Sequence, residues 1–392
     1  MAVVGAGPAG LTVANLLRRA GIGCVLLEQE SRAFIEQRPR AGFIEEWAVR
    51  GLEERGLGEQ LVAKAPRHEK FEFRFAGQRH TFRYGDVTGQ RHFVYPQQLL
   101  VTDLVAQYTD AGGEAVFEVS DVHLHDLTSD SPAVTFRTAE GEHRIDCDFV
   151  AGCDGGHGVA YDSIPAGALT SYERVYPFAW LGILARAPAS SDELIYARHE
   201  RGFALHSMRT PQIIRMYLQV ARNASRADWP DARVWDELDT RLATDAGFHL
   251  THGPVLERGI TPMRSLVTEP MRYGRLFLAG DAAHIVPPTG AKGLNLAVAD
   301  VRVLAEALIA HYRDGDDRLL DEYSARCLRR VWRAQRFSSW MTTMLHRRPD
   351  DDEFAHRLQL AELAYLTSST AAATTLAENY VGWAVDTSGP RS

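Results

Sequence analysis

The first 28 residues place a glycine-rich turn between two short apolar stretches, and this arrangement restricts the possible folds more than any other part of the chain. Residues 2–4 are apolar, the run Gly5-Ala-Gly7-Pro-Ala-Gly10 follows, residues 11–20 have helical apolar spacing, and a second apolar stretch ends at Glu28. The glycines permit a tight turn close to a pyrophosphate, the helix N-terminus faces the phosphates, and Glu28 can accept hydrogen bonds from ribose hydroxyls. The pattern predicts a Rossmann-type domain that binds an ADP-containing dinucleotide.

A second glycine-rich segment, residues 280–295, reads GDAAHIVPPTGAKGLN and follows the apolar residues 276–279. Asp281 then stands at the carboxyl end of a buried strand, where an open α/β sheet binds its ligands. The prolines and glycines after it make a tight turn with exposed backbone amides, and a helix is expected over residues 294–311. Because a helix N-terminus carries partial positive charge, the segment suits a flat, electron-rich group that becomes anionic on reduction, such as a flavin. An ordinary strand–turn–helix crossover is the alternative interpretation.

A third strand end carries another carboxylate among glycines. Residues 143–151 predict a strand that runs into Cys153-Asp154-Gly155-Gly156-His157-Gly158. A plain turn would explain this composition as well. Together with Gly280 and Asp281, however, the run predicts a second wall of one cofactor site.

Between these motifs lie residues whose local pattern has two interpretations. Arg32, Arg38 and Arg40 are either a solvated basic face or a clamp on phosphates. His68 stands alone, and a lone histidine is more often structural than catalytic. After it, residues 71–75 alternate phenylalanine with polar residues and predict a half-buried strand.

Residues 175–220 change pattern to consecutive β-type segments, expected at 175–185, 193–198, 202–209 and 213–220. Ser207 and Arg209 are two residues apart and therefore share one face of a strand. With a nearby tyrosine they would offer a hydroxyl, a guanidinium fork and a phenol to one carboxylate. Ordinary exposed polar residues of a strand are the alternative explanation.

Composition excludes several classes of protein. The net charge of −8 and the lack of a basic run argue against a nucleic-acid surface. No apolar run approaches the ~18 residues of a membrane span, and no signal-like segment begins the chain. The four cysteines show no metal-type spacing. We therefore expect a reduced, cytoplasmic enzyme without a metal or a membrane partner.

The three motifs in this order resemble those of the class A flavin-dependent aromatic monooxygenases. Longer runs, HIVPPTGAKGLN at 284–295, ELIYA at 193–197, RGFAL at 201–205 and AENYVG at 377–382, resemble the members that hydroxylate 4-hydroxybenzoate. The resemblance covers essentially the whole chain. It implies conversion of 4-hydroxybenzoate to 3,4-dihydroxybenzoate with FAD, NADH or NADPH, and O2, through a flavin C4a-hydroperoxide.

The resemblance also implies an architecture. The fold is expected to be α/β, or α+β overall, in a homodimer. Residues 1–174 would form the Rossmann-type FAD-binding domain, 175–268 a β-sheet substrate domain, and 269–392 a return to the FAD domain followed by a C-terminal helical interface.

Site residues follow from the same resemblance, position by position. The substrate carboxylate is expected on Ser207, Arg209 and Tyr217. The phenol is expected on Tyr196, backed by Tyr380, with the carbonyl of Pro288 beside it and His68 at the surface end of a proton exit. FAD contacts are expected at Gly5, Gly7, Gly10, Glu28, Arg38, Arg40, Gln97, Asp154, Asp281, Leu294 and Asn295, and nicotinamide-donor contacts at Arg38, Arg40, His157 and Arg264.

Departures from the family pattern leave two matters open. After Glu28 the chain has Gln29, Glu30 and Phe34, with Arg32 the nearest cation, where NADPH-dependent members carry a cation and a tyrosine. A 2′-phosphate needs cations, so we expect relaxed or NADH-leaning selectivity. Polarity differences at 210–214 keep a related benzoate, such as 4-aminobenzoate, as an alternative substrate. A flavoprotein that senses its ligand without turnover is the alternative from another class.

Overall fold

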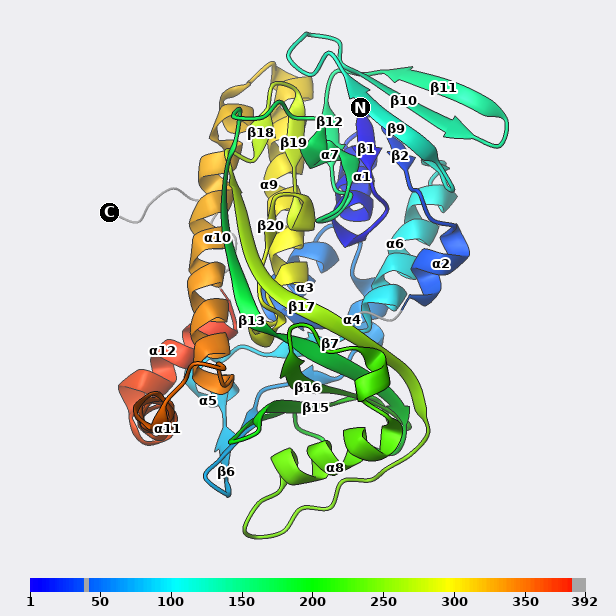
Figure 1. Cartoon of the computed structure of the whole chain (residues 1–392). Helices are drawn as coiled ribbons and strands as arrows, with labels where there is room; N and C mark the ends of the chain where they lie inside the picture. Colours follow the sequence, from blue (N-terminus) through cyan, green and yellow to red (C-terminus); the bar gives the residue numbers. More distant parts are fainter. Residues whose placement is uncertain (39–41, 383–392) are drawn as a thin grey trace.

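The computed structural model describes residues 1–38 and 42–382 and divides into two sheets joined by long strands and a helical layer (Figure 1). The six-stranded sheet has the order β18-β19-β12-β1-β2-β8 and lies near the N-terminus. The eight-stranded sheet has the order β20-β17-β13-β16-β15-β14-β5-β6 and lies at the opposite end. This mixed α/β architecture confirms the predicted fold class.

The six-stranded sheet is parallel except at its β18 edge. The central strands β1 and β12 are short and fully buried, as is usual for parallel strands covered on both faces. The helices α1 and α9 pack against each other, and α1 also packs on α6. The strands are β1 (Ala2–Val4), β2 (Val25–Leu27), β8 (Glu114–Val116), β12 (Val150–Gly152), β18 (Arg272–Tyr273) and β19 (Leu276–Leu278), and the helices are α1 (Pro8–Arg19), α6 (Gln97–Asp110) and α9 (Gly293–Asp314).

The eight-stranded sheet includes two long strands, β13 and β17, which pair with each other and extend toward the six-stranded sheet (Figure 1). Helix α8 packs on β14 and β15 on one side of the sheet. An aromatic core that includes residues of α10 and α12 lies on the other side. The elements are β5 (Phe71–Phe75), β6 (Gln78–Phe82), β13 (Thr170–Arg186), β14 (Ile195–His199), β15 (Gly202–Thr210), β16 (Ile213–Ala221), β17 (Val255–Glu269), β20 (His284–Ile285), α8 (Asp231–Leu242), α10 (Arg318–Leu345) and α12 (Thr370–Tyr380).

Smaller elements complete the chain. Two three-stranded sheets have the orders β11-β10-β9 and β3-β7-β4. Within the described residues, every helix is too short or too polar to cross a bilayer. The remaining elements are β3 (Phe43–Glu45), β4 (Arg67–His68), β7 (His92–Val94), β9 (Ser120–His125), β10 (Ala133–Thr138), β11 (Gly141–Asp146), α2 (Arg32–Gln37), α3 (Glu46–Glu53), α4 (Glu59–Lys64), α5 (Tyr84–Thr88), α7 (Val159–Asp162), α11 (Glu353–Ser368) and the short 3-10 turns η1 (Arg226–Asp228), η2 (Gly280–Ala282) and η3 (Pro288–Gly290).

Two sequence predictions of local structure were wrong. The strand predicted over 143–151 is two strands, because β11 pairs within a small antiparallel sheet whereas β12 joins the parallel one. The strand at 71–75 is buried on both faces rather than half-buried. Its polar residues Glu72 and Arg74 are buried as an ion pair, and Glu72 also pairs with Arg79.

The predicted domain boundaries remain a prediction. Strand β13 begins at Thr170, before the expected start of the substrate domain at 175, and β17 ends at Glu269. Strands β5 and β6 come from the first 174 residues but pair within the eight-stranded sheet. The eight-stranded sheet therefore includes strands from before and after the expected substrate domain at 175–268.

Candidate functional site

A cavity of about 580 Å³ lies between the two sheets. One end is formed by the glycine turn after β1 and the loop before α9, and the other by polar side chains of the eight-stranded sheet. Most of the expected site residues line it, namely Gly5, Gly7, Glu28, Arg38, His68, Gln97, Asp154, Tyr196, Ser207, Arg209, Tyr217, Asp281, Pro288 and Leu294. Gly10, His157, Arg264, Asn295 and Tyr380 lie outside this described lining, and Arg40 lies outside the described residues.

The glycine turn after β1 leaves room for a group that approaches the backbone. Gly5 has φ +100°, and a Cβ there would lie 2.5 Å from the Cys153 carbonyl oxygen. A Cβ on Gly10 would lie 1.9 Å from the Gly5 carbonyl oxygen, so Gly10 allows the turn to close. A Cβ on Gly7 would meet nothing within 4 Å, because Gly7 faces the open cavity. The turn and the N-terminus of α1 therefore fit a phosphate-bearing cofactor.

Glu28 holds this turn from the end of β2. One of its carboxylate oxygens accepts a hydrogen bond from the Ala6 N–H at 2.7 Å, and the other accepts from the Glu30 N–H at 2.9 Å. A carboxylate oxygen can accept more than one hydrogen bond. Glu28 can therefore support the turn and still accept from a ribose hydroxyl.

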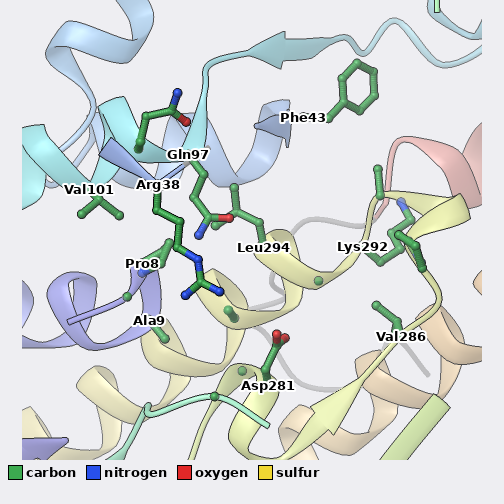
Figure 2. Close-up of a pocket in the computed structure, with 18 of the residues that line it drawn as sticks. Pro8, Ala9, Arg38, Phe43, Gln97, Val101, Asp281, Val286, Lys292 and Leu294 are labelled. Carbon is green, nitrogen blue, oxygen red and sulfur yellow. The ribbon is translucent and has the colours of Figure 1, made fainter. Parts of the chain in front are cut away.

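The loop before α9 forms the opposite wall. Figure 2 shows the Arg38 side chain between Gln97, above it, and Asp281, below it. Leu294, at the start of α9, lies beside Arg38. The Gly280 N–H donates to Asp300 at 3.0 Å, and Asp300 also contacts His284 at 2.6 Å. These buried contacts hold the loop from α9. The Asn295 side chain does not face the cavity, because it bonds to Glu45, Phe43 and Ala291 instead.

Asp154 follows β12 as the third strand end. One carboxylate oxygen accepts from the Ala160 N–H at 2.8 Å, and the other is buried without a hydrogen-bond partner among the described residues. Burial raises the pKa of Asp154 to about 6, although the hydrogen bond from Ala160 opposes this shift. The nearby His157 is exposed, and Arg264 donates to the Gly156 carbonyl at 3.3 Å. The structure therefore brings His157 and Arg264 to one turn at the edge of the site.

Cationic and hydroxyl side chains gather at the sheet end of the cavity. Ser207 and Arg209 of β15 both line the cavity, and the pairing of β15 with β16 is shifted between Met208 and Thr210. Strand β16 supplies Arg215 opposite Ser207, and Tyr217 two residues further along. Arg209 is hydrogen-bonded to Tyr217, and burial lowers the pKa of the Arg209 guanidinium. The Arg215 guanidinium lies 5.3 Å from the Tyr217 ring centroid, and its buried Nε has no hydrogen-bond partner among the described residues.

These two arginines form no ion pair with a described acidic residue. Gly182 on β13 makes room for them, since a Cβ there would lie 3.1 Å from an Arg215 nitrogen. Both arginines are half-buried, and cations held partly away from water without acidic partners are costly. The sheet end of the cavity therefore suits an anionic group.

A tyrosine pair lies beside these two arginines. Tyr196 on β14 is 1% exposed, and its hydroxyl lies 3.3 Å from that of Tyr380 on α12. Burial raises the pKa of Tyr196 to about 12 and raises that of Tyr380 further. Burial lowers the pKa of His68, with Glu193 and Asp192 opposing it. At neutral pH both tyrosines hold their protons and His68 can accept one.

Several side chains around the site were not predicted from the sequence to be site residues. Lys292 is buried, forms an ion pair with Glu45 and donates to the Tyr380 carbonyl at 2.7 Å. Burial lowers the pKa of Lys292, and Glu45 opposes this shift. Arg215, Tyr84 and His92 were also missed, since none stands in a motif with a known spacing. Arg215 alone carried a signal, as a cation on a strand that already held Tyr217.

Comparison with known proteins relates this site to flavoproteins. The model of the FAD binding domain family matches residues 1–338. The chain is 47% identical over 383 residues to p-hydroxybenzoate hydroxylase of Acinetobacter baylyi, which covers 97% of this chain and 95% of that protein. It is 29% identical over 337 residues to rifampicin monooxygenase of Streptomyces venezuelae, with 82% and 67% of the two chains covered.

Solved structures agree in fold. The p-nitrophenol 4-monooxygenase from Pseudomonas putida has a TM-score of 0.83 at 21% identity and covers 97% of this chain and 98% of that one. A ternary complex of aklavinone-11 hydroxylase with FAD and aklavinone has a TM-score of 0.74 at 21% identity, covering 88% and 68%. At these identities the two structures support the fold alone.

Among the described residues, no cluster of histidine, cysteine and acidic side chains could hold a metal ion.

Proposed function

Since this chain belongs to the FAD binding domain family, we propose that it is a flavin-dependent hydroxylase that converts 4-hydroxybenzoate to 3,4-dihydroxybenzoate with NADH or NADPH and O2. One observation carries the proposal. One cavity is lined by the cations Arg209 and Arg215 and by Tyr196, whose buried hydroxyl lies 3.3 Å from that of Tyr380, in a chain 47% identical to p-hydroxybenzoate hydroxylase of Acinetobacter baylyi.

The fit of the cavity supports FAD as the cofactor. Gly5, Gly7 and Gly10 would admit the pyrophosphate, and Glu28 would accept from the adenosine ribose. Arg38, Gln97, Asp154, Asp281 and Leu294 line the cavity between the two sheets, where the rest of an extended cofactor would lie, and Asn295 would act through its backbone. When bound, FAD supplies the activation of O2, and the protein supplies position and electrostatics.

The substrate carboxylate would bind Ser207, Arg209 and Tyr217. A guanidinium fork and two hydroxyls match a carboxylate in shape and charge. Anchoring the carboxylate determines which ring carbon faces the flavin, which is catalysis by orientation. Pro288 lines the same cavity, and its carbonyl would lie beside the phenol.

The phenol oxygen would bond to Tyr196. Hydroxylation ortho to that oxygen needs an electron-rich ring, and removal of the phenolic proton provides it. Tyr196 would pass that proton to Tyr380, and His68, whose pKa is lowered by burial, would receive it near the surface. The hydroxyl separation of 3.3 Å in the tyrosine pair supports this route.

The nicotinamide donor would bind at the cofactor end. Arg38 lines the cavity, and His157 and Arg264 lie together at the edge of the Asp154 turn. The guanidinium groups of Arg38 and Arg264 suit the donor's phosphates. Arg40 belongs to the same prediction but lies outside the described residues.

We also propose that the enzyme works in the cytoplasm as a homodimer through its C-terminal helices. The four cysteines are free thiols, which is usual in a reducing compartment. Sedimentation velocity of the purified holoenzyme would test the assembly, and a monomer at micromolar concentration would contradict it.

The test of the reaction is oxidation of NADH and NADPH by the purified yellow protein with and without 4-hydroxybenzoate, with product identified by chromatography. We expect strong stimulation and near-stoichiometric 3,4-dihydroxybenzoate. Stimulation with mostly hydrogen peroxide would indicate that another benzoate, such as 4-aminobenzoate, is the substrate. Absence of stimulation would favour a ligand sensor without turnover.

Tyr196→Phe tests the proton route within the same assay. The variant should keep substrate-triggered oxidation of the donor but divert it to peroxide, because general-base assistance contributes about 10²–10⁴-fold. A normal yield of 3,4-dihydroxybenzoate would show that Tyr196 does not carry the proton.

A further inference from the structure

Two buried polar side chains beside the tyrosine pair have no part in the route described above. Tyr84, at the start of α5, is 0% exposed, and His92, on β7, is 2% exposed. Burial of a polar group is unfavourable unless it is hydrogen-bonded. The contacts of these two residues therefore indicate what their burial achieves.

Tyr84 and His92 bond to each other and to the residue expected at the proton outlet. The Tyr84 hydroxyl donates to the His68 carbonyl at 2.6 Å, and His92 Nδ1 lies 3.2 Å from the same hydroxyl. His68 and His92 are directly opposite each other in the pairing of β4 with β7. A side chain from a third element, α5, thus ties His68 to its cross-strand partner.

The rings of Tyr84 and His92 also pack against the ring of Tyr380. The His92 and Tyr84 ring centroids each lie 5.0 Å from that of Tyr380. Phe43 stacks on His92 at 4.2 Å and meets the edge of Tyr380 at 6.1 Å. The Tyr380 carbonyl accepts from Lys292 at 2.7 Å. Tyr84 and His92 therefore contact both groups between which the proton would have to pass.

The charges around them keep both residues neutral. Burial lowers the pKa of His92, and Lys292 and His68 lower it further, whereas the Tyr380 backbone opposes them. Burial raises the pKa of Tyr84, and Tyr196, Glu193 and Glu69 add to this. The groups that face His68 are Glu193, Asp192 and Lys70. Neither Tyr84 nor His92 is suited to take up a proton itself.

We propose that Tyr84 and His92 are positioning residues of the proton exit, which hold His68 and Tyr380 in the arrangement through which the phenolic proton of the substrate leaves. The step breaks the phenol O–H bond, leaves the electron pair on the phenolate oxygen and delivers the proton to solvent. This inference rests on the proposed function and names residues that it does not include.

The test is proton release on binding. The holoenzyme is mixed with 4-hydroxybenzoate in weakly buffered solution that contains phenol red, and the rate and amount of released proton are followed by stopped flow. Tyr84→Phe and His92→Leu should slow release by about tenfold or more, since small misplacements are costly in a relay, while the substrate Kd changes by less than about twofold. kcat should fall without a matching rise in KM.

Two further variants separate positioning from a general effect on folding. In His92→Asn the side-chain amide can replace Nδ1, so the release rate should return to within about threefold of wild type. Tyr108→Phe is the matched control, because the buried Tyr108 hydroxyl also donates to a backbone carbonyl at 2.6 Å, that of Cys24, away from the cavity. It should release the proton at the wild-type rate. FAD content confirms that each variant is folded.

The outcomes are distinct. Wild-type release rates in both Tyr84→Phe and His92→Leu would overturn the inference and leave the proposed function intact. An equal slowing in Tyr108→Phe would also overturn it, because the effect would then follow from loss of any buried hydroxyl. If wild type binds 4-hydroxybenzoate without releasing a proton, the proposed proton route fails and the inference fails with it. If His92→Leu lacks FAD, Tyr84→Phe decides, and a wild-type release rate in that variant would overturn the inference.

Discussion

The two ends of the cavity are built in different ways. The cofactor end is made largely of backbone, with a glycine turn, the first turns of α1 and α9, and Glu28 bonded to backbone N–H groups. The aromatic end is made of side chains from β14, β15, β16 and α12. Binding at the cofactor end should therefore be little affected when a side chain is changed but weakened when a methyl group is added to a glycine. Binding at the aromatic end should be weakened when a side chain is removed and little affected by an added methyl group.

The largest effect is expected at the aromatic end, from Arg209→Ala. Loss of one partner of a buried charge pair costs about 3–5 kcal/mol, so the Kd for 4-hydroxybenzoate should rise by roughly 100-fold or more. The flavin absorbance change on titration with substrate measures it. FAD content should be unaffected, and Arg209→Lys should recover part of the affinity. An unchanged Kd would place the carboxylate elsewhere.

The corresponding change at the cofactor end is Gly10→Ala. Its Cβ would lie 1.9 Å from the Gly5 carbonyl oxygen, so the turn must shift. Overpacking of this kind costs about 1–3 kcal/mol, and FAD should bind roughly tenfold more weakly. Quenching of FAD fluorescence by the apoenzyme measures the Kd. Gly259→Ala on β17 is the control, because a Cβ there meets nothing within 4 Å. Equal affinities would show that backbone fit does not distinguish this end.

A pH effect should distinguish Asp154 from other acids of the cofactor end. Because burial raises its folded pKa to about 6, above the unfolded value of about 3.9, its neutral form is favoured by folding. That stability is fully present below about pH 4 and is lost as the pH rises through about 6. In the FAD-free protein, Asp154→Asn should remove on the order of 1–3 kcal/mol of this pH dependence. Urea unfolding between pH 4 and 8 tests it, with exposed Asp162→Asn as control; parallel curves for wild type and Asp154→Asn would contradict it.

The smallest effect concerns the nicotinamide donor. Arg32, the cation nearest the end of β2, is paired with Glu36 at 2.8 Å, and Glu30 would oppose a 2′-phosphate. We expect kcat/KM for NADH to equal or exceed that for NADPH. Glu30→Gln should raise the NADPH value by about two- to fivefold, because the half-buried Glu30 still contacts solvent, which screens its charge. Exposed Glu140→Gln should change neither value. A strong NADPH preference in wild type would refute the argument.

Local sequence patterns were informative where the function depends on consecutive residues. The turn from Gly5 to Gly10, the carboxylate at Glu28 and the strand ends at Asp154 and Asp281 all line or support one cavity. Ser207 and Arg209, predicted to share a face because side chains alternate along a strand, both line this cavity, although the pairing of β15 with β16 is shifted between Met208 and Thr210. The roles of these residues remain predictions. Their placement together follows from the carboxyl ends of parallel strands meeting at one edge of a sheet.

The sequence by itself therefore determined the cofactor fold, the order of its motifs and the strand that carries Ser207 and Arg209, because glycine, strand alternation and helix N-termini act over a few residues. The tertiary structure alone decided the separation of Tyr196 from Tyr380, which are 184 residues apart, and the ion pair of Lys292 with Glu45. It alone also decided the hydrogen bonds of Tyr84 to His68 and His92. It also buried both faces of β5 and turned the Asn295 side chain away from the cavity. These contacts join side chains from distant elements. They depend on how the whole core packs, and no local spacing encodes that packing.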